Sequence, residues 1–230
     1  MDKIGVGILT YKRYEPLCKL TESIVTKCSY DYLLVSNDDR DNQGVAVNSN
    51  RLIKGLYDRG CDFIFILNDD VLALGDFTQL YVDASKDTGI DHFSFRRPAL
   101  AKVEDDIKIN NTELTVLYSI TGNMLFLTRN LVDKIGYFDT NYGKYVEEHV
   151  DYTKRANLSG AFKDVKVHVG RSLDVKKSID LLSTQEFKSS VEDKDKSYWH
   201  TIASTYNNNK WNTPIKKVPL YVPFCDRIPY

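Results

Sequence analysis

The triplet Asn68-Asp69-Asp70 is the group of residues in this sequence best suited to chemistry. It follows an apolar run, Phe63–Leu67, which predicts a buried strand. The carboxyl ends of parallel strands border ligand-binding crevices, and carboxylates gathered there suit Mg²⁺ or Mn²⁺. Asn and Asp are also ordinary turn formers, so the triplet by itself fits an acidic turn equally well.

The elements that must position this triplet are expected to alternate between strand and helix. The predicted order is strand, helix, strand, helix, strand, over Ile4–Leu9, Glu15–Thr26, Tyr32–Val35, Val45–Tyr57 and Phe63–Leu67. This order predicts a parallel sheet with right-handed crossovers. Polar residues follow all three strands, at Thr10–Arg13, Asn37–Asp39 and Asn68–Asp70, so these tips are expected to line one cleft.

The rest of the chain is less regular. Helices are predicted over Phe77–Ala84, Arg129–Ile135, Tyr152–Leu158 and Ile179–Phe187. Strands are predicted over His92–Phe95, Leu114–Leu117 and Val165–Val169, the last presenting His168, and Met124–Leu127 is apolar. The tail from Trp211 to Tyr230 holds four of the six prolines, so it is expected to wrap the domain as extended chain.

Bulk composition narrows the class of protein. The 230 residues include 42% hydrophobic residues, enough for a substantial core, and 31 basic residues balance 32 acidic ones. A net charge of −1 gives no support for a globally basic, nucleic-acid-binding surface. No signal peptide, no apolar stretch near the ~20 residues of a membrane span and no C-x-x-C spacing are present. A cytoplasmic protein is expected, or one of the host cytoplasm if the source is viral.

A series of short motifs occurs in order between about residues 4 and 172. They are Thr10-Tyr11-Lys12-Arg13, Asn37-Asp38, Asn42-Gln43-Gly44 with Asn48, Leu67–Val71, Thr121–Met124, Gly136–Asp139, Glu148–Asp151 with Arg155 and Gly160, and Val167-His168. Together they resemble the motif set of family 2 glycosyltransferases, in which Leu67–Val71 would be the D-x-D motif. The resemblance implies an α/β protein of the GT-A fold, with a Rossmann-like mixed central sheet flanked by helices and a C-terminal extension.

The resemblance also implies roles for individual residues. Thr10, Tyr11 and Asp38 would hold the nucleoside of a nucleotide sugar, with Asn48 in the same donor-binding set. Asn68 would lie near the ribose or the sugar. Asp70 would bind a divalent cation, Mn²⁺ or Mg²⁺, with help from Asp69, and His168 would be a further metal ligand.

The general base is where the sequence departs from the resembled family. The residue after the motif's Glu is usually Asp, and here it is His149. Three candidates stay open: His149, whose ordinary pKa of ~6.5 suits proton abstraction near neutrality, Glu148 one residue earlier, and Asp151 one helical turn along. Separately, Arg96-Arg97-Pro98 could contact a diphosphate or an acidic acceptor, although a solvated turn explains it better.

The resulting hypothesis is a metal-dependent, inverting hexosyl- or pentosyltransferase that uses a nucleotide-diphosphate sugar, with a UDP-sugar favoured. The acceptor would be a glycan or another hydroxyl, with a modified DNA base as one option. Residues 1–172 would form the catalytic domain, with a nucleotide-binding half (1–70) and an acceptor half (71–172), and residues 173–230 a segment packed on it. The alternatives are a non-catalytic nucleotide-sugar or carbohydrate-binding module on a degenerate GT-A scaffold, and a metal-dependent nucleotidyltransferase.

Overall fold

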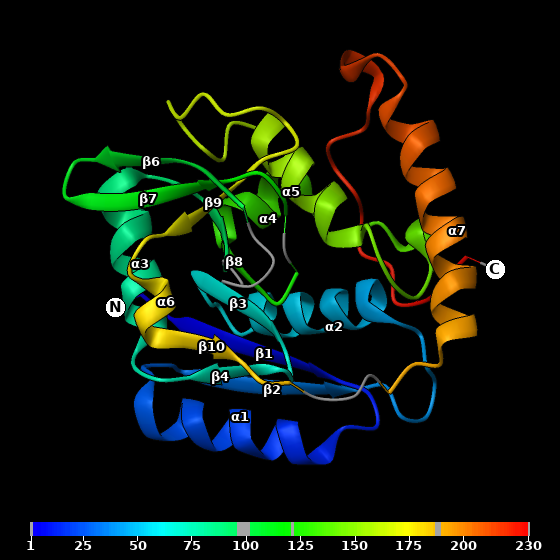
Figure 1. Ribbon diagram of the computed structural model, residues 1–230, viewed down its shortest axis with the longest axis horizontal. Coiled ribbons are helices and arrows are strands. Elements are labelled where there is room, and N and C mark those ends of the chain that lie inside the picture. Colours follow the sequence, from blue (N-terminus) through cyan, green and yellow to red (C-terminus); the bar gives the residue numbers. More distant parts are fainter. Residues whose placement is uncertain (1, 96–101, 121, 187–189, 230) are drawn as a thin grey trace.

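The computed structural model describes residues 2–95, 102–120, 122–186 and 190–229 (Figure 1). Its centre is a five-stranded sheet in the order β2-β1-β3-β8-β5. The strands are β1 (Ile4–Thr10), β2 (Tyr32–Asn37), β3 (Phe63–Asn68), β5 (His92–Ser94) and β8 (Met124–Thr128). β1 is parallel to β2 and β3, whereas β8 is antiparallel to β3 and β5. The prediction of a mixed α/β sheet is therefore confirmed.

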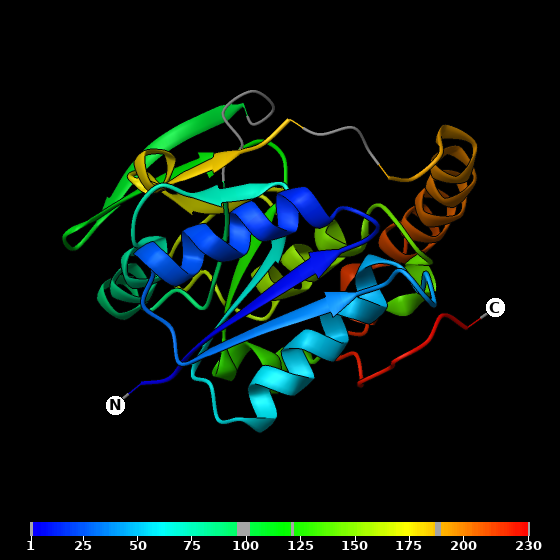
Figure 2. The same ribbon diagram turned by 90° about the horizontal axis from the view of Figure 1, so that it is seen from below.

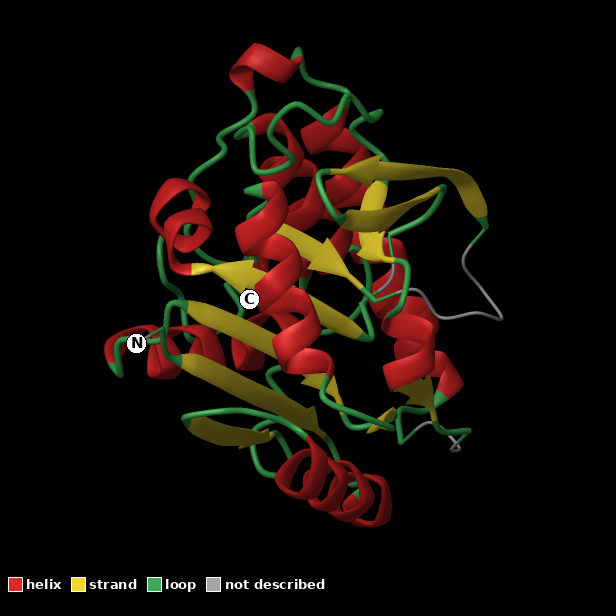
Figure 3. Ribbon diagram, turned by 90° about the vertical axis from the view of Figure 1, so that its left-hand side faces the viewer, coloured by secondary structure: helices red, strands yellow, loops and turns green. Residues whose placement is uncertain are grey.

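Helices cover both faces of this sheet. α1 (Tyr14–Lys27) and α2 (Val45–Asp58) lie on opposite faces of β1 and β2 (Figures 1 and 2). α3 (Phe77–Thr88), α4 (Arg129–Ile135) and α5 (Glu148–Leu158) follow later in the chain, and Figure 3 shows helices on both sides of the strands. Because both faces are covered, the strands can be apolar along almost their whole length, as β3 is from Phe63 to Leu67.

The core forms around Phe65 in β3. Its ring packs edge-on against Phe77 and Phe126, with ring centroids 5.5 and 5.2 Å apart, and against Tyr81 at 6.1 Å. Edge-to-face aromatic pairs add about 0.5–1.5 kcal/mol each beyond the area they bury. These contacts join β3 to α3 and β8 and fix the strand that delivers Asn68-Asp69-Asp70.

Two small sheets extend the central one. β6 (Val103–Ile109), β7 (Thr112–Leu117) and β9 (Ser172–Val175) form an antiparallel sheet, and β4 (Val71–Ala73) pairs with β10 (Leu182–Thr184). The shorter helices are α6 (Ser178–Leu181), η1 (Thr140–Tyr142) and η2 (Ile215–Lys217), and α7 (Asp193–Trp211) is the longest helix described. Strand β9 begins at residue 172 and β10 follows it, and the division of the chain at that residue stays a prediction.

Several local predictions were wrong. The helix expected over Ile179–Phe187 ends at Leu181, and the next residues pair with β4, because a strand edge was available to them. Val165–Val169 is not a strand. β6 and α7 were not predicted, because β6 is mostly exposed and acidic and α7 shows little apolar periodicity. In the described part of the chain, no helix combines the length and apolar character that crossing a bilayer requires.

His92 makes the stability of this core sensitive to acid. The imidazole is fully buried, donates from Nδ1 to the Phe126 carbonyl (2.8 Å), accepts at Nε2 from the Thr153 hydroxyl (2.8 Å) and stacks on Phe162. Burial lowers its pKa to about 4. The unfolded chain, with an ordinary pKa of ~6.5, therefore binds the proton first, and folding stability decreases as pH falls from about 6.5 to 4.

We expect the free energy of unfolding to lose up to about 3 kcal/mol over this pH range because of His92 alone. Urea titrations at several pH values would measure it. His92→Asn should flatten this part of the pH profile, whereas His200→Gln, at an exposed histidine of α7, should leave it unchanged. Equal pH profiles for wild type and His92→Asn would contradict the assignment.

Candidate active site

A cleft of about 320 Å³ lies at the carboxyl ends of the parallel strands β1, β2 and β3. Its lining comes from the strand tips and from loops that reach them: Leu9, Thr10, Tyr11, Arg13, Ser36, Asp38, Gly44, Val45, Asn48, Asn68, Asp69, Asp70, Tyr145, Ser190 and Val191. All residues expected to bind a donor, together with Asp70, are in this set. The cleft exists because neighbouring parallel strands end on one edge of the sheet.

Asp69 holds an arginine at this cleft. Its side chain is buried, accepts a hydrogen bond from the Thr10 hydroxyl (2.7 Å) and forms an ion pair with the Arg13 guanidinium. Burial raises the pKa of Asp69, while Thr10 and Arg13 oppose that rise without cancelling it. Arg13 ends the motif Thr10-Tyr11-Lys12-Arg13, but a role for it follows only from its contact with Asp69, which lies 56 residues away in the chain.

Asp70 is the more accessible of the two carboxylates. It is half-buried, lines the cleft and accepts a hydrogen bond from Asn123 (3.2 Å). In the described residues, no group of three or more His, Cys, Asp and Glu side chains forms a metal-binding cluster. One or two carboxylates together with substrate phosphates are nevertheless the usual ligand set of Mg²⁺, and Asp70 fits that pattern.

Asp38 and Asn48 brace one wall of the cleft. The Asp38 carboxylate accepts from the backbone N–H groups of Gln43 and Gly44, at 2.7 Å each. Asn48 accepts from the Ser36 hydroxyl (2.6 Å) and donates to the Gly44 carbonyl (2.7 Å). These bonds hold the chain between β2 and α2 in one conformation and so shape the surface that a ligand would meet.

The other wall comes from the loop after η1. At Gly44, whose φ is 86°, an added Cβ would lie 2.3 Å from the backbone of Lys144, so only glycine allows this approach. Val45 donates its N–H to the Lys144 carbonyl (2.8 Å), and the Tyr145 hydroxyl donates to Asn42 (2.8 Å). The loop thus lies against the wall that Asp38 and Asn48 brace, and it leads directly into Glu147 and Glu148.

Glu148 and His149 begin α5 after a strained turn. Val146 and Glu147 have φ values of 76° and 69°, a region that a β-branched residue such as Val rarely adopts. Strain of about 1–3 kcal/mol per residue persists only where surrounding structure enforces it, commonly at functional sites. The turn fixes the direction of the buried Glu148 side chain and of the His149 ring beside it.

Glu148 and His149 form a hydrogen-bonded pair. The Nδ1 atom of His149 lies 3.1 Å from Oε1 of Glu148, and the ring packs on Gly122, where a Cβ would lie 2.9 Å from Cγ. Burial disfavours the charged ring, but Glu148, the charge of Glu147 and a hydrogen bond to the Ile120 backbone outweigh it and raise the pKa of His149. The Glu148 carboxylate and the Ile120 carbonyl are both hydrogen-bond acceptors. The cationic ring of His149 can donate to both of them, one from each nitrogen.

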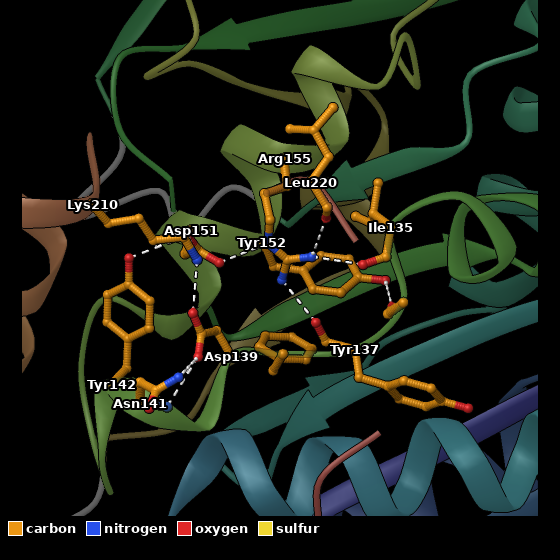
Figure 4. A network of polar contacts seen from close by, with 12 residues as sticks. Ile135, Tyr137, Asp139, Asn141, Tyr142, Asp151, Tyr152, Arg155, Lys210 and Leu220 are labelled. Atoms are coloured by element: carbon orange, nitrogen blue, oxygen red, sulfur yellow. Dashed lines mark hydrogen bonds and ion pairs between the residues drawn. The ribbon is translucent and has the colours of Figure 1, made fainter. Parts of the chain in front are cut away.

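Asp151 is held in a separate buried network (Figure 4). Its carboxylate pairs with Arg155 (2.7 Å) and Lys210 (2.7 Å) and accepts from the Tyr142 hydroxyl (3.2 Å). Lys210 also pairs with Asp139 (2.8 Å). Burial acts to raise the pKa of Asp139, but Lys210 outweighs it and the pKa is lowered. With these partners, Asp151 is suited to holding α5 and α7 together.

His168 lies apart from the residues of the cleft. It is exposed, accepts at Nδ1 from the Gly170 N–H (3.3 Å) and lines a second hollow, beside β6. The structure therefore does not place it among the cleft-lining residues with Asp70, and its role as a metal ligand stays a prediction. Arg96-Arg97-Pro98 and Thr121 lie outside the described residues.

The fold of the chain is similar to that of known glycosyltransferases. Neither a protein-family model nor a curated protein matches the sequence. Among solved structures, Drosophila β1,4-galactosyltransferase 7, in complex with manganese, UDP-Gal and xylobiose, superposes with a TM-score of 0.51 at 15% identity, over 86% of this chain and 79% of that one. This chain has the GT-A fold. The fold expected from the motif series is thereby confirmed.

A second similar structure is S. aureus TarS. The TM-score is 0.54 at 11% identity, over 93% of this chain and 44% of that one. For TarS residues 1–349 in complex with UDP, the TM-score is 0.53 at 12% identity, over 94% and 73%. Both comparisons agree on the GT-A fold despite identities that are too low to carry anything beyond it.

Lys210 should be indispensable for stability, because it is the cation that joins both buried carboxylates. Lys210→Met removes the cation paired with Asp139 and leaves Asp151 with Arg155 alone, and breaking a buried pair in this way costs about 3–5 kcal/mol. Lys194→Met, in an exposed pair on the same helix, should change the unfolding free energy little. Urea denaturation would measure both, and equal midpoints would contradict a structural role for the network.

Proposed function

We propose that this protein is a glycosyltransferase that moves a sugar from a nucleotide-diphosphate donor, a UDP-sugar by preference, to an acceptor hydroxyl. The observation that carries the proposal is the single cleft at the ends of β1, β2 and β3, which gathers Thr10, Tyr11, Asp38, Asn48 and Asn68–Asp70. The GT-A fold and the UDP or UDP-Gal bound in two structures similar to it support the choice of donor.

The cleft supplies the charge that a diphosphate needs. Arg13, oriented by Asp69, adds a guanidinium to the lining, and guanidinium groups bind phosphate oxygens through paired donors. Asp70 would hold a divalent cation, Mn²⁺ or Mg²⁺, together with the donor's diphosphate oxygens. When bound, that cation neutralises negative charge on the leaving diphosphate. Thr10, Tyr11 and Asp38 would contact the nucleoside, and Asn68 the ribose or sugar.

Transfer needs the acceptor's proton to be removed. The acceptor oxygen attacks the anomeric carbon, the bond from that carbon to the diphosphate oxygen breaks, and its electron pair leaves with the diphosphate. A single displacement of this kind inverts the anomeric configuration. We assign the proton acceptor to Glu148, because His149 is suited to the cationic form that donates to Glu148 and to the Ile120 backbone. His149 is then the positioning residue, and Asp151 a structural one.

The roles of Glu148 and His149 can be separated by kinetics. Glu148→Gln should lower the rate of transfer by about 10²–10⁴-fold, because it removes the base. His149→Gln should lower it less and should shift the pH profile, since the positive charge beside Glu148 is lost. A loss in His149→Gln as large as in Glu148→Gln, with an unshifted pH profile in the residual activity, would instead make His149 the base.

Donor cleavage should depend on Asp70. Asp70→Asn is expected to reduce Mn²⁺-dependent hydrolysis of UDP-sugars by about 100-fold or more, because charge stabilisation by a metal is worth several kcal/mol. Asp180→Asn, at an exposed aspartate, is the matched control. Hydrolysis that survives a chelator, or that is equal in Asp70→Asn and wild type, would contradict the metal assignment.

His149 also favours a second candidate, a non-catalytic nucleotide-sugar-binding module, because it replaces the carboxylate usual at that position. Calorimetry with UDP-sugars, followed by an assay of turnover, separates the two. Donor binding that is not followed by hydrolysis or transfer would favour the module. A product that retains the nucleotide, with release of diphosphate, would identify a nucleotidyltransferase, and the absence of both binding and turnover would refute the proposal.

A further inference from the structure

Tyr118 presents an aromatic ring at the surface, directly after β7. Its side chain is 48% exposed, although β7 itself is largely buried. The guanidinium of Arg171 lies over the ring, 4.3 Å from its centroid. An exposed aromatic ring with a planar cation on one face offers its edge and remaining surface to a ligand.

The stack is fixed from several sides. Arg171 forms an ion pair with Glu104 of β6 and donates to the Tyr118 carbonyl (3.4 Å). The Ser172 hydroxyl donates to the Ser119 carbonyl (3.0 Å), so the start of β9 is tied to the end of β7. The Tyr118–Arg171 stack is therefore a platform that is ordered before a ligand arrives, and such a platform loses little entropy when a ligand binds.

A hollow of about 490 Å³ continues from this platform. Glu104 lines it from β6, and residues 164–168 of the loop after α5 line it as well; Figure 1 shows this loop beside β6. Ile107, Val116, Val165 and Val167 contribute apolar surface. The charges around the hollow balance one another, with Glu104, Asp105 and Asp164 against Lys108, Lys166 and the Arg171 guanidinium that pairs with Glu104. Apolar surface bordered by balanced polar groups suits an uncharged, hydroxyl-rich ligand better than an anion.

The platform is also connected to the pair proposed to remove the proton. Gly122 comes four residues after Tyr118 in the chain, so the two lie at most about 14 Å apart. Gly122 packs on the His149 ring. A short oligosaccharide that rests on Tyr118 can therefore extend one hydroxyl toward Glu148.

We propose that Tyr118, Arg171 and the hollow beside β6 form the acceptor site, and that its ligand is an uncharged oligosaccharide. Sugar C–H groups would pack on the aromatic ring, whose face carries partial negative charge, and sugar hydroxyls would bind Glu104 and Arg171. The inference rests on the proposed function for the identity of the reaction, but binding at this site does not require turnover. His168 then lines the acceptor site, as an alternative to ligating a metal.

The test is binding of the full chain to an array of uncharged and acidic oligosaccharides, followed by transfer assays with the retained sugars and a UDP-sugar. We expect uncharged oligosaccharides to be retained. Tyr118→Ala should weaken binding about 3- to 10-fold, the worth of one aromatic contact, and raise the acceptor KM similarly. Tyr118→Phe should keep the binding affinity and the acceptor KM of the wild type. Tyr221→Ala, at an exposed tyrosine of the tail, should change neither quantity.

Donor hydrolysis separates this inference from the proposed function. It should be equal in Tyr118→Ala and wild type, because Tyr118 is not among the residues that line the donor cleft. If hydrolysis is absent in wild type while Tyr118-dependent sugar binding persists, the proposed function fails and the sugar site stands. Retention of acidic sugars alone, retention of none, or equal retention by Tyr118→Ala with a normal melting curve would overturn the acceptor site.

Discussion

The buried ion network of Asp139, Asp151, Arg155 and Lys210 is the constraint on which the packing of α5, α7 and the C-terminal tail depends (Figure 4). Two carboxylates and two cations make it neutral overall, which is the condition under which buried charges are tolerated. Arg155 donates beyond it to the backbone carbonyls of Ile135, Tyr137 and Leu220. The network thus joins α5, the loop after α4, α7 and the C-terminal tail.

This network explains how the strained turn before α5 is maintained. The ion pairs of Asp151 fix the first turn of α5, and the contact between Gly44 and the Lys144 backbone fixes the loop before α5. Between these two anchors, Val146 and Glu147 keep positive φ values that neither would adopt alone. The result is that Glu148 and His149 have a set position relative to the cleft formed by β1, β2 and β3.

Local pattern predicted the first seventy residues well, because β1 to β3 are apolar runs and α1 and α2 have periodic apolar faces. It failed where an element depends on a partner distant in the sequence. β10 forms because the edge of β4 accepts it, and α7 packs through Trp199 on Gly143 and through Lys210 on Asp139. Neither contact leaves a periodic signal in the sequence. The helix predicted over Ile179–Phe187 was therefore wrong beyond Leu181, and α7 was not predicted.

The sequence by itself determined that the polar residues after β1, β2 and β3 line one cleft, because parallel strands end on a common edge of the sheet. The GT-A architecture was implied by the resemblance of the motif series. Only the tertiary structure decided which contacts each of those residues makes. Asp69 is buried beside Thr10 and holds the Arg13 side chain in place, whereas Asp70 stays accessible in the cleft. Likewise, the sequence motif does not distinguish the two carboxylates of Glu148 and Asp151. In the structure, Asp151 is neutralised by two buried cations, whereas Glu148 faces a single histidine.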